Sequence, residues 1–276
     1  MSELLVPSAS APDSDGAILN ITPESAGWER VGFEVLDLPP GGTAERECGP
    51  RELCIVVISG AVNVGSEHGE WFDLGGRPDP WAGLPDAAYL PPESHVDLRA
   101  ADDGAEVALC WGPAHKGGAT PRVLPGAEIE AQTRGQGVYE RVIHPILMDD
   151  QGAESLLVAE VLTPAGHWSR YPPHKHDHDD PPGQSHLEEV YYHRIKPERG
   201  FGLQRVYAYD SGLDEAMTVH DRDCVLIPRG YHTLSAPPGY DLYSLNVMAG
   251  PSRLWAVVDD PEHDWILHGS DSNPAS

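Results

Sequence analysis

Residues 166–176 read Gly-His-Trp-Ser-Arg-Tyr-Pro-Pro-His-Lys-His, and they decide how the rest of the chain is interpreted. In a β-strand, side chains two residues apart face the same side, so His174 and His176 present two imidazoles to one space. Glu189 opens a later strand-like run and can add a carboxylate oxygen. His232 follows a Pro/Gly turn and can add a third imidazole. Three imidazoles and one carboxylate suit a divalent metal and leave positions open for water or substrate.

The histidine pair alone is weak evidence, because the chain has 14 histidines. The following Asp-His-Asp-Asp run at 177–180 is equally compatible with an exposed acidic loop. The wider pattern favours a metal site: a glycine precedes the pair, Glu-Val-Tyr-Tyr follows at 189–192, and Pro-Arg-Gly-Tyr leads into His232. We expect zinc as the ion, with Mn, Fe, Ni and Co as alternatives.

Outward from this stretch, short apolar runs alternate with Gly, Pro and Asp turns, as at 53–58 and 242–248. Glycine (29) and proline (27) are abundant, yet hydrophobic residues still make up 40% of the 276 residues, which suits a core of many short strands. No long window shows helical periodicity. The sequence therefore predicts an all-β protein.

Two similar halves are also indicated. Leu-Pro-Pro-Glu-Ser-His at 90–95 and Ile-Pro-Arg-Gly-Tyr-His at 227–232 each precede a strand-like run, as though one hairpin were used twice. Residues 113–137 have a weak apolar pattern and are typical of a connection. We expect a flexible arm at 1–25, a first barrel at 26–130 and a second barrel at 131–276.

The charge balance limits the partners. Eighteen basic residues against 44 acidic ones give a net charge of −26, which repels nucleic acids and anionic membrane surfaces. The four cysteines form no Cys-x-x-Cys pair and are typical of buried reduced thiols. Residues 1–16 lack the features of a signal peptide, and no apolar run is long enough to span a bilayer. We expect a cytoplasmic protein that binds a small molecule.

The motifs resemble those of the cupins, and more closely those of the 5-deoxyglucuronate isomerases of inositol catabolism. The matching segments lie at 171–177, 187–194, 202–207, 228–232 and 239–251, with a looser match at 84–92. The gap between His176 and Glu189 is longer than in most cupins but typical of this family. It leaves Glu188 as an alternative ligand, and Arg222 stands where cupins usually have glycine. The resemblance implies a bicupin, two jelly-roll barrels in one chain. Its first barrel has lost the metal, in line with the absence of any His-x-His before residue 170.

The resemblance also implies conversion of 5-deoxy-D-glucuronate into 2-deoxy-5-keto-D-gluconate, a sugar-acid isomerisation. This chemistry needs a Lewis acid, a base and a cation for the distal carboxylate. Glu188, Asp241 and Lys175 are the candidate bases, although Lys175 alternates with the ligand histidines and is expected to point away from the metal. The candidate substrate-binding residues in the motifs are Arg170, Tyr171, Arg194, Gln204, Arg205, Tyr207, Arg229, Tyr231, Tyr243 and Asn246.

Three alternatives remain open at this stage: an isomerase of a related keto-uronate, an Fe-dependent cupin dioxygenase, and a non-catalytic sugar-binding bicupin. The long gap after His176 argues against the first, and the arginine- and tyrosine-rich motifs favour a polar anionic ligand over the substrates of the second. Cupins commonly pair through their sheets, so we expect a homo-oligomer. Residues 177–186 are a candidate lid over the site.

Overall fold

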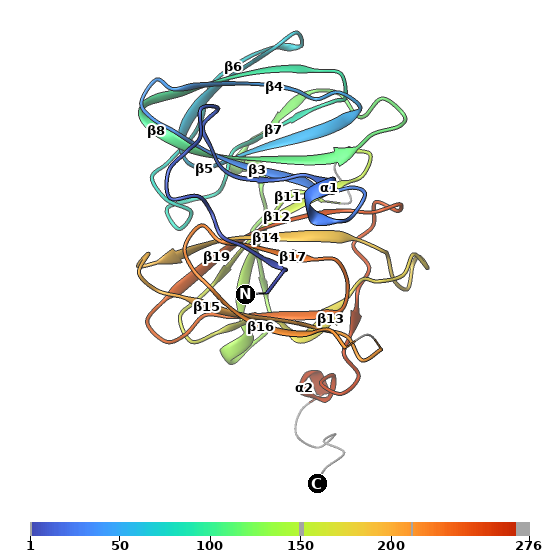
Figure 1. Ribbon diagram of the computed structural model, residues 1–276. Coiled ribbons are helices and arrows are strands. Elements are labelled where there is room, and N and C mark those ends of the chain that lie inside the picture. The colour runs from blue at the N-terminus through green and yellow to red at the C-terminus, as the bar shows by residue number, and fades with distance from the viewer. Residues whose placement is uncertain (1, 149–151, 211, 269–276) are drawn as a thin grey trace.

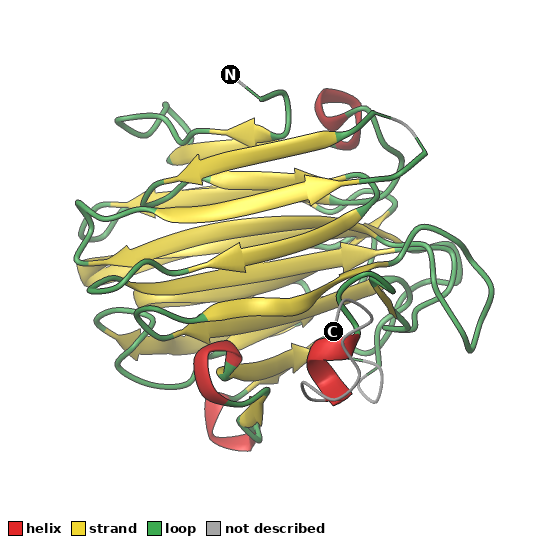
Figure 2. Ribbon diagram, turned by 90° about the horizontal axis from the view of Figure 1, so that it is seen from below, coloured by secondary structure: helices red, strands yellow, loops and turns green. Residues whose placement is uncertain are grey.

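The computed structural model describes residues 2–148, 152–210 and 212–268, and antiparallel strands make up nearly all of its regular structure (Figures 1 and 2). The all-β prediction is confirmed. The helices are short: α1 (Pro23–Ala26), α2 (Trp265–His268) and 3-10 turns at Gly126–Glu128 and Gly137–Tyr139. No helix of the described ranges is long and apolar enough to cross a membrane.

The first half of the chain forms one large sheet, in which strands pair in the order β2-β3-β8-β5-β7-β9, with β4 on β8 and β6 on β5. Its strands are β2 (Ala17–Ile21), β3 (Gly32–Leu38), β4 (Thr43–Glu47), β5 (Arg51–Ser66), β6 (Gly69–Arg77), β7 (Ala87–Leu90), β8 (His95–Pro113) and β9 (Arg122–Leu124). Aliphatic and aromatic side chains such as Leu53, Ile55, Leu98 and Trp111 fill one of its cores.

The second half forms two sheets that face one another across a barrel (Figure 1). One runs in the order β1 (Leu5–Val6), β17 (Cys224–Ile227), β14 (Glu188–Lys196), β19 (Asp241–Ala249), β12 (Leu156–Thr163), β11 (Arg141–Leu147), β10 (Gln132–Arg134). The other runs in the order β16 (Asp214–Val219), β15 (Gly202–Tyr207), β18 (Tyr231–Ser235), β13 (Trp168–Lys175), β20 (Val258–Asp259). The strand β9 belongs to the sheet of the first half, and the next strand, β10, belongs to a sheet of the second half. Because residue 130 lies between these two strands, we keep 130/131 as the proposed boundary between the barrels.

The N-terminal segment differs from the expected loose arm. Leu5 and Val6 pair with Val225 and Cys224 of β17, so the chain starts on the sheet of the second half before it enters the first. Residues 17–21 form β2 and are largely buried. Two short apolar segments, 4–6 and 17–21, supply enough surface to pack, which the Ser/Pro/Asp-rich composition around them conceals.

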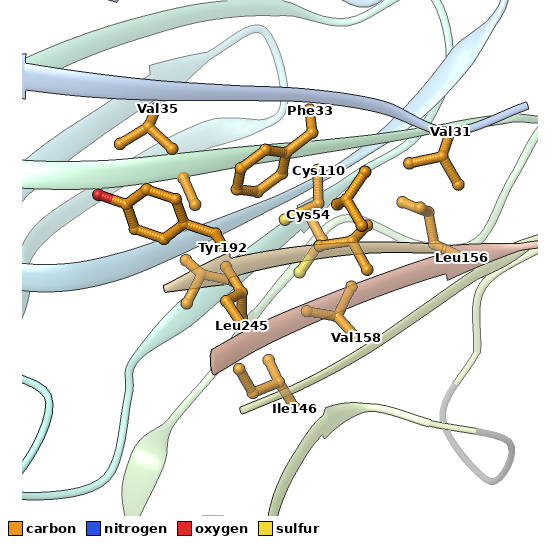
Figure 3. Close-up of a cluster of buried hydrophobic side chains, with 14 of the residues drawn as sticks. Val31, Phe33, Val35, Cys54, Cys110, Ile146, Leu156, Val158, Tyr192 and Leu245 are labelled. Atoms are coloured by element: carbon orange, nitrogen blue, oxygen red, sulfur yellow. The ribbon is translucent and has the colours of Figure 1, made fainter. Parts of the chain in front are cut away.

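A shared apolar cluster joins the halves (Figure 3). Phe33 from the first half lies against Tyr192 from the second, with ring centroids 5.8 Å apart. Cys54 and Cys110 lie in the same cluster. All four cysteines are free and buried, which confirms the prediction of reduced thiols, and burial raises the pKa of Cys54 to about 12.

Candidate metal centre

Three histidines meet inside the second barrel. His174 on β13 and His232 on β18 are direct partners across the sheet, with ring centroids 4.6 Å apart. His176 follows the last residue of β13, and its ring lies 5.1 Å from that of His232. One ring nitrogen of each histidine lies within 4.8 Å of those of the other two, and all three residues are buried. The two-residue spacing therefore brings the predicted imidazoles together.

Glu189 reaches the same cluster from the facing sheet. Its Oε2 lies 3.0 Å from His176 Nε2 and 3.2 Å from His232 Nε2. Asn246 Nδ2 donates to Glu189 Oε1 at 2.8 Å, and Ser244 Oγ donates to Asn246 Oδ1 at 2.9 Å. This chain of hydrogen bonds fixes the carboxylate and places Asn246, a predicted substrate residue, behind it.

Backbone carbonyls orient two of the rings. Nδ1 of His176 lies 2.8 Å from the carbonyl oxygen of Leu187, and Nδ1 of His232 lies 3.1 Å from that of Gly230. With the proton donated at Nδ1, each ring turns the lone pair of Nε2 toward Glu189. Lone pairs and a carboxylate oxygen at such short distances repel one another unless a cation or a proton lies between them.

The ionisation states fit the same conclusion. Burial, together with the neighbouring positive groups, holds the pKa of His174 well below its usual value, and burial also lowers the pKa of His232. Burial alone would raise the pKa of Glu189, but hydrogen bonds from His176 and His232, when these rings carry a proton on Nε2, hold it well below its usual range; a metal ion would replace those protons. Three imidazole nitrogens and one carboxylate are a donor set that fits Zn²⁺ or another divalent transition metal.

Glu188 and Glu189 point to opposite faces of β14. The carboxylate of Glu188 accepts hydrogen bonds from the backbone N–H groups of Glu29, Arg30 and Val31, at 2.8, 2.7 and 3.0 Å. The structure thus places Glu188 at the contact between the halves and outside the histidine cluster. Because the carboxylate of Glu188 is occupied by these three backbone N–H groups, Glu189 is the carboxylate that reaches the histidines.

The other two candidate bases also lie away from the histidines. Asp241 opens β19, whereas the site lies toward the end of that strand, and its Oδ1 accepts the N–H of Ala165 at 2.9 Å. Lys175 points to the outer face, where its Nζ lies 5.0 Å from the centroid of the Tyr231 ring and 3.6 Å from Asp177. The expected outward direction of Lys175 agrees with this placement.

Most predicted substrate arginines are paired elsewhere. Arg194 binds Glu106 of the first half at 2.9 Å and Asp221 at 2.9 Å. Arg205 binds the exposed Asp214 at 2.7 Å. Arg229 is half-exposed, 3.8 Å from Asp210. Of these arginines, only Arg170 lies at the mouth of the barrel that contains the histidine cluster.

The predicted tyrosines lie outside the barrel interior. Tyr207 and Tyr231 face each other on the outer side of the five-stranded sheet, and the Tyr207 hydroxyl donates to Asp260. Tyr171 packs on Trp168, and Tyr243 packs on Trp81 of the first half. None of these rings contacts the histidine cluster.

Tyr191 and His193, both within the matching segment 187–194, are interior residues; the sequence offered Tyr191 as a possible hydrogen-bond partner of substrate hydroxyls and gave His193 no role. They share a face of β14 with Glu189, and the Tyr191 ring lies 5.8 Å from that of His232. His193 Nε2 lies 2.9 Å from Oε1 of Gln204, a predicted substrate residue, and burial lowers the pKa of His193 to about 4. The alternation along 189–193 carries the signal that identifies both.

A cavity of about 520 Å³ opens beside this interior. Arg170, which is only 3% exposed, and Trp255 form one wall, with the Arg170 guanidinium 4.6 Å from the centroid of the Trp255 ring. Ile143 and Ala159 form an apolar wall from β11 and β12. Ala159 pairs with Asn246, the residue that holds Glu189, so the cavity lies beside the metal centre.

Fold and site together define a class: a two-barrel cupin with a buried three-histidine, one-carboxylate site in its second barrel. A 15%-identical solved structure, a mutant of Bacillus subtilis oxalate decarboxylase, shares the fold with a TM-score of 0.65 over 99% of this chain and 86% of that one. The chain belongs to the KduI/IolB family, whose model matches residues 4–266.

Relatives with known names cover nearly the whole chain. The 5-deoxy-glucuronate isomerase of Geobacillus kaustophilus is 47% identical over 97% of this chain and 96% of its own length. That of Bacillus subtilis (strain 168) is 41% identical over 97% and 99%. The crystal structure of an IolB-like protein from Salmonella typhimurium, 40% identical, superposes with a TM-score of 0.92 over 96% of this chain and 100% of that one.

Proposed function

We propose that this chain is a metal-dependent isomerase that converts 5-deoxy-D-glucuronate into 2-deoxy-5-keto-D-gluconate in the cytoplasm, as a step of inositol catabolism. The observation that carries the proposal is the near full-length match to 5-deoxy-glucuronate isomerases, at 41–47% identity for the relatives described. The buried donor set in the second barrel supports it independently, because aldose–ketose isomerisation requires stabilisation of negative charge on an oxygen.

His174, His176, His232 and Glu189 would hold the ion, with zinc as first choice and Mn, Fe, Ni and Co as alternatives. A divalent ion bound there would act as a Lewis acid toward the carbonyl oxygen of the sugar. The chain's own contribution is orientation: Asn246 fixes Glu189, and two backbone carbonyls fix the ring faces of His176 and His232. Such outer contacts commonly set metal affinity.

The group that moves the proton must face the barrel interior. Glu188, Asp241 and Lys175 do not face it, since each is bonded elsewhere. Tyr191 and His193 take their place as candidates because they lie on the same face of β14 as Glu189. His193 is neutral at pH 7, since burial lowers its pKa to about 4.

The test is turnover of 5-deoxy-D-glucuronate in deuterated water, followed by NMR on protein of known metal content. The proposal predicts ketone formation, with deuterium beside the new carbonyl when the proton exchanges through an enediol. The His174→Ala/His176→Ala variant should lose turnover. The control variant His115→Ala, on the exposed surface, should keep it. Absence of turnover by metal-filled wild-type protein would refute the substrate assignment.

A further inference from the structure

Arg141 and Arg170 are two neighbouring arginines without a direct ion pair in the described residues; Asp259 acts on Arg141 only from a distance. Neither forms an ion pair within 4.0 Å with any Asp or Glu of the described residues. The buried Arg77 and Arg194, by contrast, bind Glu160 and Glu106 at 2.8 and 2.9 Å. In a chain with a net charge of −26, a buried arginine (Arg170) and a partly buried one (Arg141) without an ion pair require an explanation.

The two guanidinium groups are incompletely satisfied. Nε of Arg141 and Nε of Arg170 are both buried without a hydrogen-bond partner in the described residues. Burial, and then the nearby charge of Arg170, lowers the pKa of Arg141 to about 10. Two like charges held out of water destabilise one another, and an anion between them would remove that penalty.

The backbone at Arg170 is also unusual, with φ at 57°. This left-handed conformation is costly for a residue with a Cβ atom and persists where surrounding structure imposes it, often at functional sites. Here it directs a 3%-exposed side chain onto Trp255 at the cavity wall. The strain fixes the position of one guanidinium group.

Both arginines lie next to the cavity. Arg170 lines the cavity, and Arg141 lies two residues before Ile143, another lining residue, on the same face of β11. Arg170 and His174 of the histidine cluster lie on the same strand, β13. Glu128 and Glu130 also line the cavity but are exposed and pair with neither arginine.

We infer that Arg141 and Arg170 form the binding site for the carboxylate of the sugar-acid substrate and set the preference for acids over neutral sugars. The inference rests on the proposed function. A guanidinium group binds a carboxylate with two parallel hydrogen bonds, and burial strengthens them. The carboxylate of a six-carbon aldose acid lies at the opposite end from its aldehyde. A bound molecule would therefore direct its carboxylate to the arginines and its aldehyde end to the metal centre.

Steady-state kinetics with 5-deoxy-D-glucuronate and its neutral counterpart 5-deoxy-D-glucose test the inference. For Arg141→Met and for Arg170→Met, we expect kcat/KM for the acid to fall roughly 10- to 100-fold, mostly through KM, and kcat/KM for the neutral sugar to change little. Arg141→Lys should recover part of the loss. Arg99→Met removes an exposed positive charge in the first half and should behave as wild type. Equal losses on both substrates, or none, would overturn the inference.

Calorimetric titration of the metal-loaded protein with D-glucuronate and D-glucose separates this inference from the proposed function. Wild-type protein should bind D-glucuronate at least tenfold more tightly than either arginine variant, with D-glucose unaffected. If wild type binds D-glucuronate through both arginines but does not turn over 5-deoxy-D-glucuronate, the carboxylate site stands and the proposed function fails. If wild-type turnover is normal and the arginine variants retain both turnover and binding, the carboxylate site fails alone.

Discussion

Asn246 lies outside the histidine cluster, yet it fixes the carboxylate of Glu189 that reaches the cluster. Its Nδ2 donates to Glu189 Oε1 at 2.8 Å, which leaves Oε2 turned toward His176 and His232. We predict that Asn246→Ala weakens zinc binding by roughly 10- to 100-fold, because the carboxylate is then free to rotate. Competition with a chromophoric chelator measures the affinity. Asn20→Ala on the exposed surface is the control, and equal affinities in both variants would contradict the assigned role.

His193 should make stability depend on pH. The pKa of His193 is about 4 in the folded protein, whereas that of an exposed histidine is near ~6.5. Between these two pH values the unfolded chain therefore binds a proton that the folded chain does not. Stability from this residue is complete above ~6.5 and is lost as the pH falls toward 4. Between pH 7.5 and 5 we expect a loss of about 2 kcal/mol. Urea unfolding should show this loss in wild type and not in His193→Gln; identical slopes would contradict it.

At the residue scale, the sequence predicted which side chains gather in the histidine cluster better than it predicted the positions of the other motif residues. The pairing of His174 with His176 follows from strand alternation, which is local, and Glu189 was preferred because it directly precedes the strand at 190–191. Membership of a motif does not say which face a side chain occupies. Tyr231 precedes His232 and therefore faces outward, a conclusion available from the same alternation. Arg141 lies outside every matching motif, and only the fold brings it beside Arg170.

The element β1 shows how a two-residue strand can matter. Leu5 and Val6 extend the sheet at β17, and the carbonyl of Leu4 accepts the N–H of Leu226 at 2.8 Å. We predict that deleting residues 2–7 destabilises the protein by about 2–4 kcal/mol through lost apolar burial and exposes the edge of β17. Thermal unfolding should show a midpoint lower by several degrees. Ser10→Ala is the control, and an unchanged midpoint would show that β1 is dispensable.

The segment 177–186, a predicted lid, is tied to the wall of the cavity. Ser185 Oγ donates to the carbonyl of Leu254 at 2.6 Å, and its N–H donates to that of Ala256 at 3.0 Å. The two acceptors are the neighbours of Trp255, whose ring packs against the Arg170 guanidinium. We predict that deleting residues 178–183 reduces turnover more than it lowers the unfolding midpoint. Unchanged activity in the deletion variant would argue against a lid.

At the scale of the molecule, buried glutamates connect the halves in both directions. Glu52 of the first half accepts the backbone N–H groups of Glu154, Ser155 and Leu156, at 2.8, 2.7 and 2.9 Å. Glu188 of the second half accepts three N–H groups from residues 29–31. Each carboxylate satisfies backbone donors that would otherwise be buried without partners.

Glu52→Gln and Glu188→Gln should each destabilise the protein by about 2–4 kcal/mol, because an amide offers one acceptor oxygen where three donors converge. Urea unfolding measures the loss, and Glu24→Gln on α1 controls for the change of charge. A loss no larger than that of the control would show that the apolar cluster alone holds the halves together.

The two-barrel plan was predictable because its signals repeat. The turn at 90–95 leads from β7 into β8 as the turn at 227–232 leads from β17 into β18. The return of the N-terminus to the second half was not predictable, since pairing between segments so distant in sequence leaves no local pattern. The residue at which one barrel ends, and the expected homo-oligomer, remain predictions.

The central claim is that the second barrel holds one functional metal ion. Metal-stripped protein titrated with zinc, with turnover of 5-deoxy-D-glucuronate recorded at each addition, tests it most directly. The account predicts that activity rises linearly to one equivalent and then stays constant, and that His174→Ala/His176→Ala stays inactive throughout. Full activity of the stripped protein, or activation of the double variant equal to that of wild type, would contradict it.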